Sequence, residues 1–321
     1  MKILILAHPY LNLHVPIIEE LKKQGHNVVY IEDKKLKFDY HYKYLNKIKK
    51  FLYLCLQKTL KTGTSYWRNK FNELDELNTY YDVFFCIQGL SFSKILINHL
   101  RTYNPNIKTS LYIWDSNKYY NFFRNISYFD NVYTFDLEDS KISHKVNFLP
   151  FYWIPSLNEY KIKYDLSFIG TDHDNRLSLI EKMKQQIIDN KLSYYIKVVK
   201  SQKHDNSELN QIKSEFIINR PIDLNDSNKI MQESNCILDI DRPIQSGTTP
   251  RFIWAMALGK KIITTNEFIK NMPFYDKNQI LIINRDNPVL DIEFIKDRKN
   301  KYIINDYVNS LRIDKWISNF I

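Results

Sequence analysis

Glycine, cysteine and long apolar runs are all scarce in this chain of 321 residues. Its six glycines form no G-x-G-x-x-G pattern, which argues against a nicotinamide or flavin enzyme. There is also no Walker loop, no His/Cys zinc spacing and no G-x-S-x-G elbow. No apolar run approaches the roughly 20 residues of a membrane-spanning helix, and the run at residues 3–7 is too short for a signal peptide. We therefore expect a cytoplasmic protein.

Acidic residues are scarce between residues 34 and 70, where eleven lysines and arginines accompany a single acid, Asp39. Apolar and aromatic side chains interleave with them, and residues 44–60 have the spacing of an amphipathic helix. Such a helix binds anionic membranes, although the same pattern suits a helix that packs on a core and exposes a basic face. The formal charge of +10 likewise predicts an anionic partner: nucleic acid, a phosphorylated small molecule or a membrane surface.

The three cysteines, Cys55, Cys86 and Cys236, lie far apart with no paired spacing. Cys86 and Cys236 fall within apolar runs that are typical of strands. This placement predicts buried free thiols.

Short apolar runs alternate with helical patterns along the whole chain. Strands are predicted at residues 2–7, 27–32, 83–88, 110–114 and 131–135, and again at 164–170, 194–199, 236–240, 261–265 and 280–283. Helices are predicted at residues 15–24, 91–103, 175–190, 223–234, 250–258 and 306–321. Continuous apolar strands separated by helices favour parallel sheets covered on both faces.

The length of the chain exceeds what one hydrophobic core usually supports, so two domains are expected. Pro150 and Pro155 interrupt the alternating pattern. We therefore predict an α/β protein with two Rossmann-like domains, residues 1–155 and 156–305, and a closing helix at 306–321 that joins the first. Functional loops of such domains follow the carboxyl ends of the strands, facing a shared interdomain cleft.

The clearest candidate site lies at residues 239–266, DIDRPIQSGTTPRFIWAMALGKKIITTN. Thr249 is a natural N-cap, and Pro250 a natural first residue, for the helix that follows. A helix N-terminus with hydroxyls and an arginine suits a diphosphate, although the same residues fit a capped helix with a solvated arginine. The candidate anion-binding residues of this segment are Gln245, Gly247, Thr248, Thr249 and Arg251.

Further candidates follow the other strands of the second half. Gly170 and Thr171 end a strand where backbone amides can approach a phosphate. Arg176 and Lys200 can pair with the same anion or remain solvated.

Two candidates for proton transfer follow strands of the first half. His8 follows the first strand, and a histidine suits a base near neutral pH, but it also suits a loop-capping role. Asp115 follows the fourth strand, where it can act as a base, position an acceptor hydroxyl, or cap a helix near residues 117–125. Both are kept as candidate catalytic residues.

Three segments resemble two-domain (GT-B) glycosyltransferases that build bacterial lipopolysaccharide and capsular polysaccharide. They are the order of strand, Q-x-G-x-T-x-R, helix and G-K-K-I-I-T-T-N at residues 239–266, DLSFIGTDHDNR at 165–176, and NFLPFYW at 147–153. Nearly all of this lies in the carboxyl-terminal half. Many GT-B enzymes carry a Glu in the helix after the donor loop, whereas residues 252–257 contain no acid, so nucleotide recognition must use other groups.

The resemblance implies a hexosyl- or related transferase (EC 2.4) that moves a sugar from a nucleotide-sugar donor to a glycan or glycolipid acceptor. It implies an acceptor-side first domain, a donor-binding second domain, no metal and no cofactor. It also implies a lipid-linked acceptor in cell-surface polysaccharide synthesis, peripheral binding to the inner face of the membrane, and no nucleic-acid partner. Two alternatives fit the same residues: a sugar- or polyol-phosphate transferase, and a non-catalytic member of a polysaccharide assembly complex.

Overall fold

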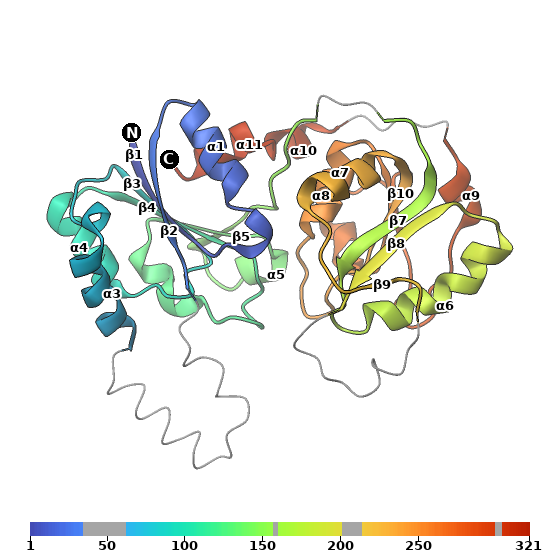
Figure 1. Cartoon of the computed structure of the whole chain (residues 1–321), viewed down its shortest axis with the longest axis horizontal. Helices are drawn as coiled ribbons and strands as arrows, with labels where there is room; N and C mark the ends of the chain where they lie inside the picture. The colour runs from blue at the N-terminus through green and yellow to red at the C-terminus, as the bar shows by residue number, and fades with distance from the viewer. Residues whose placement is uncertain (35–61, 157–159, 201–213, 299–303) are drawn as a thin grey trace, which may run out of the picture. The chain divides into compact units, whose positions relative to one another are not determined.

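The computed structural model describes the chain except residues 35–61, 157–159, 201–213 and 299–303 (Figure 1). It divides into two compact units, Met1–Leu149 with Ile313–Ile321, and Pro150–Arg312. Each unit contains one six-stranded sheet in which every neighbouring pair of strands is parallel. The predicted α/β class with two parallel sheets is confirmed. Among the described helices, none combines the length and apolar content that crossing a bilayer requires.

The sheet of the first unit has the order β2-β1-β3-β4-β5-β6. Its strands are β1 Lys2–Ala7, β2 Asn27–Glu32, β3 Val83–Ile87, β4 Lys108–Ile113, β5 Asn131–Thr134 and β6 Val146–Phe148. From β1 the chain moves to one side to form β2, whereas β3 and the later strands extend to the other side. The strand order therefore reverses between β1 and β3, and we call this place the first switch point.

Helices and short 3-10 turns connect these strands. They are η1 Tyr10–Asn12, α1 Val15–Lys23, α3 Thr62–Glu73, η4 Asp75–Leu77, α4 Lys94–Tyr103, η5 Phe123–Tyr128 and α5 Leu137–Ser140. The amphipathic helix expected at residues 44–60 lies outside the described residues. No helix begins at residue 117, since the first helical turn after β4 is η5.

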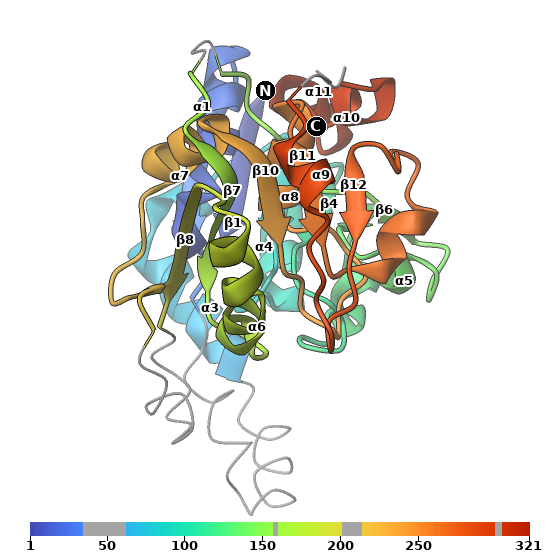
Figure 2. The ribbon, with the colours of Figure 1, turned by 90° about the vertical axis from the view of Figure 1, so that its right-hand side faces the viewer.

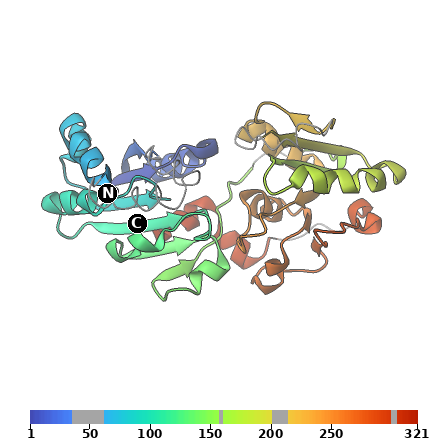
Figure 3. The same cartoon turned by 90° about the horizontal axis from the view of Figure 1, so that it is seen from below.

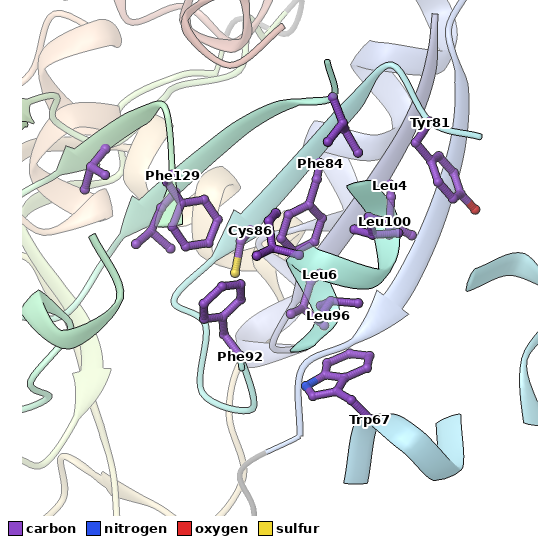
Figure 4. Packing of buried hydrophobic residues seen from close by; sticks show 14 of the residues in the cluster. Leu4, Leu6, Trp67, Tyr81, Phe84, Cys86, Phe92, Leu96, Leu100 and Phe129 are labelled. Carbon is purple, nitrogen blue, oxygen red and sulfur yellow. The ribbon is translucent and has the colours of Figure 1, made fainter. Parts of the chain in front are cut away.

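One face of the first sheet packs against α3 and α4. Figure 4 shows side chains of β1 and β3 meeting those of α4, with Trp67 of α3 beside them. Trp67 is fully buried, and its indole N–H donates to the backbone oxygen of Ser91 at 2.7 Å. Cys86 lies within this core, where burial raises the pKa of its thiol. Cys86 and Cys236 are both buried free thiols, as predicted.

The other face of this sheet receives the end of the chain, α11 Ile313–Trp316 and η7 Ile317–Asn319. The ring of Phe320 stacks on Phe85 of β3 with centroids 4.2 Å apart. Trp316 meets Tyr112 of β4 edge-on at 4.9 Å. These aromatic contacts explain why the last nine residues belong to the first unit although the preceding 163 form the second.

The sheet of the second unit has the order β12-β11-β10-β7-β8-β9, with its strands side by side in Figure 2. They are β7 Tyr164–Thr171, β8 Tyr194–Val199, β9 Ile217–Ile218, β10 Ser234–Asp239, β11 Lys261–Thr264 and β12 Ile280–Ile282. The chain moves from β7 toward β8 on one side and from β10 toward β11 on the other. The second switch point therefore lies between β7 and β10.

The helical segments of the second unit are α6 Arg176–Asp189, α7 Leu224–Gln232, α8 Pro250–Ala257, η6 Glu267–Asn271, α9 Ile292–Lys296 and α10 Asp306–Ser310. The long yellow-green helix of Figure 3 is α6, which runs along the sheet and shares a buried apolar cluster with β7, β8, β10 and α9. Because parallel crossovers are right-handed, α6 and α8, which lead in opposite directions, cover opposite faces.

The two units meet along the chain at Leu149 and Arg312, whereas the sequence placed these boundaries at residues 155 and 305. The indole N–H of Trp153 donates to the backbone oxygen of Val308 at 2.7 Å, and its backbone N–H donates to that of Leu311. These bonds hold residues 306–312 in the second unit. The single helix expected at 306–321 is consequently broken into α10, α11 and η7.

Candidate functional site

In open parallel sheets, ligands bind beyond the carboxyl ends of the strands at the point where the strand order reverses. At the second switch point, β7 leads into residues 172–176 and β10 leads into the loop that reaches Thr249. At the first switch point, β1 leads into His8 and β3 leads into Gln88. Most of the residues selected from the sequence therefore lie at these two places.

Thr249 caps α8 as predicted. Its hydroxyl accepts a hydrogen bond from the backbone N–H of Phe252 at 3.1 Å and donates one to Asp239 at 2.6 Å. Pro250 occupies the first turn of the helix. Asp239 itself is 1% exposed, so the cap joins the start of α8 to a carboxylate buried at the end of β10.

Arg251 is not the solvated arginine that the sequence left open, because its guanidinium is bonded within the second unit. Its Nε and Nη2 both donate to one carboxylate oxygen of Asp239, at 3.2 and 2.9 Å. Its Nη1 donates to the backbone oxygen of Ile169 at 2.5 Å, and the guanidinium lies 4.6 Å from the ring centroid of Phe168. The side chain thus clamps β10 to β7 inside the second unit.

Gly170 leaves the space that this clamp occupies. A Cβ at residue 170 would lie 3.0 Å from Nη1 of Arg251 and 2.9 Å from the ring of Phe168. The glycine therefore serves the packing of Arg251, and the close approach of backbone to phosphate expected from the sequence stays a prediction.

Arg176 begins α6 and is 7% exposed. The carboxylates of Asp239 and Asp241 act on its charge. Its Nη1 donates to the backbone oxygen of Thr171 at 3.0 Å, whereas its buried Nε has no partner within the described part of the chain. Burial, and next the charge of Arg251, lowers the pKa of Arg176 to about 10. Arg176 thus stays cationic at neutral pH.

Thr248 provides a second buried polar atom at this edge of the sheet. Its side chain is buried, and its hydroxyl likewise lacks a partner among the described residues. The adjoining loop is fixed from β11, because the side-chain amide of Asn266 donates to the backbone oxygens of Ser246 and Gly247 at 3.2 Å. Buried polar atoms without partners are rare in proteins and often mark the place of a missing ligand or water.

Two further arginines at this edge, Arg285 and Arg242, are not among the candidates that the sequence indicates. Arg285 donates to the carboxylate of Asp241 at 3.1 Å and to the backbone oxygen of Asp174 at 2.8 Å. Arg242 pairs with the carboxylate of Asp174 at 2.9 Å. Burial raises the pKa of Asp241, against the opposing charge of Arg285. The local sequence does not predict these pairs, since the partners are separated by 44 to 111 residues along the chain.

The remaining candidates of the second unit lie around this edge. Gln245 bonds through its backbone N–H to the oxygen of Arg242, which makes a turn in the β10 loop. Lys200 is exposed and follows β8, one strand beyond β7, directly before undescribed residues. Among the described residues, no group of three or more His, Cys, Asp and Glu side chains is arranged to hold a metal ion.

In the first unit, His8 is half-buried at the carboxyl end of β1. Its Nδ1 lies 3.0 Å from the backbone oxygen of Asp33. A carbonyl oxygen can only accept, so this bond places the proton of the neutral ring on Nδ1 and leaves Nε2 with a lone pair. Asp33 was missed, although it directly follows the strand at residues 27–32.

Asp115 is half-buried beyond the end of β4 and does not cap a helix. Its carboxylate accepts a hydrogen bond from the side-chain amide of Gln88 at 3.1 Å. Gln88 was predicted as the last residue of a strand, but it has a left-handed backbone with φ 70°. The hydrogen bond brings together the loops that follow β3 and β4.

A scan against protein-family models finds no match, and a search of curated protein sequences finds none either. Among solved structures, sucrose-phosphate synthase from Thermosynechococcus elongatus aligns with a TM-score of 0.50 and 12% identity over 89% of this chain and 86% of that one. The DNA-modifying β-glucosyltransferase aligns at 0.49 and 15% over 100% and 98%, and UGT89C1 of Arabidopsis thaliana at 0.48 and 10% over 98% and 93%. The chain therefore has the two-unit, Rossmann-like fold of the GT-B glycosyltransferases.

Proposed function

We propose that this chain is a glycosyltransferase that moves a sugar from a nucleotide-sugar donor to a glycan acceptor. The observation that carries the proposal is that Nε of Arg176 and the hydroxyl of Thr248, both buried at the second switch point, have no hydrogen-bond partner among the described residues. A nucleoside diphosphate supplies the oxygens that these groups lack. The GT-B fold is consistent with this chemistry.

The charges at this edge favour Arg176 as the residue that meets the diphosphate. Arg251 is engaged by Asp239, and Arg285 by Asp241. Arg176 instead donates to a backbone oxygen and is coupled to Asp239 and Asp241 only through space. Phosphate oxygens bind arginine strongly, and the positive end of the dipole of α6, which begins at Arg176, adds to the attraction.

Several residues of the β10 loop complete the proposed donor site. Thr248 offers its hydroxyl, while Gly247 and Gln245 bring backbone close to the start of α8. Gly170 and Thr171 border the site from β7, and Lys200 can reach it from β8. Thr249 and Arg251 support the site by holding Asp239. We propose that these groups neutralise the leaving diphosphate without a metal ion.

His8 is the proposed general base. Since Nδ1 is engaged with the backbone of Asp33, Nε2 is the atom that takes the proton of an acceptor hydroxyl. Asp115 is proposed to accept a hydrogen bond from the same acceptor and orient it. Both residues belong to the first unit, as expected for an acceptor-side domain.

The acceptor is proposed to be a lipid-linked glycan of lipopolysaccharide or capsule synthesis, used at the inner face of the cell membrane. The formal charge of +10 and the basic stretch at residues 34–70 support a peripheral association with anionic lipid. Residues 35–61 of this stretch lie outside the described residues, so the support here comes from sequence.

Calorimetric titration with UDP, GDP, dTDP and ADP in the presence of EDTA tests the donor site. We expect one of these nucleotides to bind the parent protein. Arg176→Met should weaken that binding roughly 10- to 100-fold, because a charged hydrogen bond contributes about 1.5–3 kcal/mol. Lys182→Met, an exposed change on the same helix, is the matched control and should bind as the parent does. Absence of binding by all four, or equal binding by Arg176→Met, contradicts the proposed donor site.

A further inference from the structure

We propose that Gln88 is a positioning residue that fixes the carboxylate of Asp115, which in turn orients the acceptor hydroxyl. The inference rests on the proposed function, because it assigns Gln88 to the same reaction. It is carried by the hydrogen bonds, the backbone conformation and the place of Gln88 in the sheet.

The side-chain amide of Gln88 bridges two consecutive residues of the β4 loop. Its Nε2 donates to Oδ2 of Asp115 at 3.1 Å, and its Oε1 accepts from the backbone N–H of Trp114 at 3.2 Å. The backbone N–H of Gln88 also donates to Tyr112 of β4 at 2.8 Å. The glutamine side chain offers both the donor that a carboxylate needs and the acceptor that a backbone N–H needs.

The backbone of Gln88 is strained where a glycine would be relaxed. Its φ is 70° and the side chain is buried, with 1% exposed. The left-handed conformation costs a residue with a side chain about 1–2 kcal/mol, which glycine avoids. The chain nevertheless carries glutamine at this position and has its glycine at the next one, Gly89, also left-handed. Retention of strain at a buried amide is typical of a functional constraint.

The surrounding loop is held from several sides, so it can maintain this strain. Both oxygens of the Asp33 carboxylate are used: one accepts from the backbone N–H of Leu90 at 2.6 Å, and the other from the N–H and hydroxyl of Ser91. The hydroxyl of Tyr120 donates to the backbone oxygen of Gly89 at 2.9 Å. The loop that carries Gln88 is therefore held in place, and its side-chain amide has a fixed position.

Gln88 also lies between the two proposed reacting groups. In the sheet register, Ala7 is opposite Ile87, and Ile87 is opposite Tyr112, so His8 and Gln88 leave the sheet at the same level. β1 and β4 flank β3, which separates their axes by two strand spacings, about 10 Å. By holding Asp115 from β3, Gln88 determines where that carboxylate stands relative to His8.

The test uses release of nucleotide from whichever of UDP-, GDP- and dTDP-hexose the parent protein turns over, with membranes as the acceptor source, and measures kcat, donor KM and melting temperature. Gln88→Gly keeps the left-handed backbone but removes the amide. Gln88→Glu keeps the shape and the acceptor for Trp114 but turns an oxygen toward Asp115. We expect each to lower kcat roughly 10- to 100-fold with donor KM changed less than twofold, because a misplaced group costs about 100-fold in rate.

The double variant Gln88→Glu/Asp115→Asn exchanges the carboxylate and the amide. It should recover the melting temperature that Gln88→Glu loses, since the hydrogen bond forms again with its roles reversed, but it should not recover kcat. Parental kcat in Gln88→Glu, beside a large loss in Asp115→Asn, overturns the inference and leaves the proposed function intact. A fall in kcat that is accompanied by an equally large fold-change in donor KM also overturns the inference. Parental kcat in Asp115→Asn, or no nucleotide release by the parent protein, contradicts the proposed function instead.

Discussion

Arg251 donates two hydrogen bonds to a single carboxylate oxygen of Asp239, from Nε and from Nη2. The Asp239 side chain is 2% exposed and that of Arg251 is 14% exposed, so the pair is shielded from water. The segment that resembles a donor loop thus contains an arginine whose charge is already matched within the protein. The residue that we propose for a ligand phosphate is Arg176, at the start of a different helix.

Arg251→Met should destabilise the fold more than it weakens nucleotide binding. Removing one partner of a buried pair leaves the other uncompensated and costs about 3 kcal/mol. Urea denaturation measures the loss. The double variant Asp239→Asn/Arg251→Met should recover part of it, because no buried charge remains unpaired. A single variant as stable as the parent, or a double variant less stable than the single one, contradicts the structural role of this pair.

Arg176→Met should behave in the opposite way. Burial of the Arg176 guanidinium beside Arg251 is unfavourable, as its lowered pKa indicates. Replacement by an apolar side chain of similar length is therefore expected to leave the melting temperature unchanged or to raise it, while nucleotide binding weakens roughly 10- to 100-fold. A melting temperature that falls by more than about 5 °C, equivalent to about 1–2 kcal/mol in a domain of this size, shows that the residue is mainly structural.

Lys260 gives the fold a defined dependence on pH. Its ammonium donates to the backbone oxygen of Gln232 at 2.7 Å, and burial lowers the pKa of Lys260 from 10.5 to about 8. The unfolded chain therefore binds more protons between pH 8 and pH 10.5, and this residue makes the free energy of unfolding rise with pH across that window.

Urea denaturation from pH 7 to pH 10 checks this expectation. The free energy of unfolding of the parent should increase relative to that of Lys260→Met as the pH rises. Lys270→Met, a change at an exposed lysine, should show a constant difference from the parent. A constant difference for Lys260→Met as well contradicts the assigned shift.

His8→Asn tests the proposed base. The asparagine amide can still donate to the backbone oxygen of Asp33 but offers no group that takes a proton near neutral pH. The rate of nucleotide release should fall about 100- to 10,000-fold, with nucleotide affinity unchanged. His144→Asn, at an exposed histidine, is the control. A His8→Asn protein that retains the parental rate assigns proton transfer to another group.

Membrane association can be tested separately from catalysis. Changing four of Lys43, Lys47, Lys49, Lys50 and Lys58 to Gln should release the protein from anionic vesicles, since each basic residue near such a surface contributes about 1 kcal/mol. Sedimentation with phosphatidylserine vesicles measures the effect. Parental sedimentation of the variant contradicts membrane docking by this stretch.

The sequence was a good guide to the fold because the relevant signals are local. Apolar runs such as VFFCI identify strands buried on both faces, and Thr249-Pro250 identifies the start of α8. The short strands β6 and β9, of three and two residues, carry too few positions to show a period and were missed. The break of the last helix was missed because it depends on Trp153, which lies about half the chain away.

The places of the candidate residues in the fold were predictable from the sequence, but their contacts were less so. Reading the residue after each strand located His8, Asp115 and Arg176, since parallel strands deliver their loops to one edge. The ion pair between Arg251 and Asp239 depends on how β7 and β10 pair, which cannot be predicted from the sequence. The sequence places Gln88 at the end of a strand, because a left-handed backbone conformation does not change the hydrophobic pattern.

Transfer of radiolabelled hexose from UDP-, GDP- and dTDP-hexoses into a lipid-extractable product, in EDTA and with membranes as the acceptor source, tests the account most directly. The parent protein is predicted to transfer label from one donor, and His8→Asn and Arg176→Met are each predicted to reduce transfer at least 10-fold while His144→Asn and Lys182→Met do not. No transfer from any donor, or equal transfer by all four variants, would contradict the assignment of this chain as a glycosyltransferase with its donor site at Arg176.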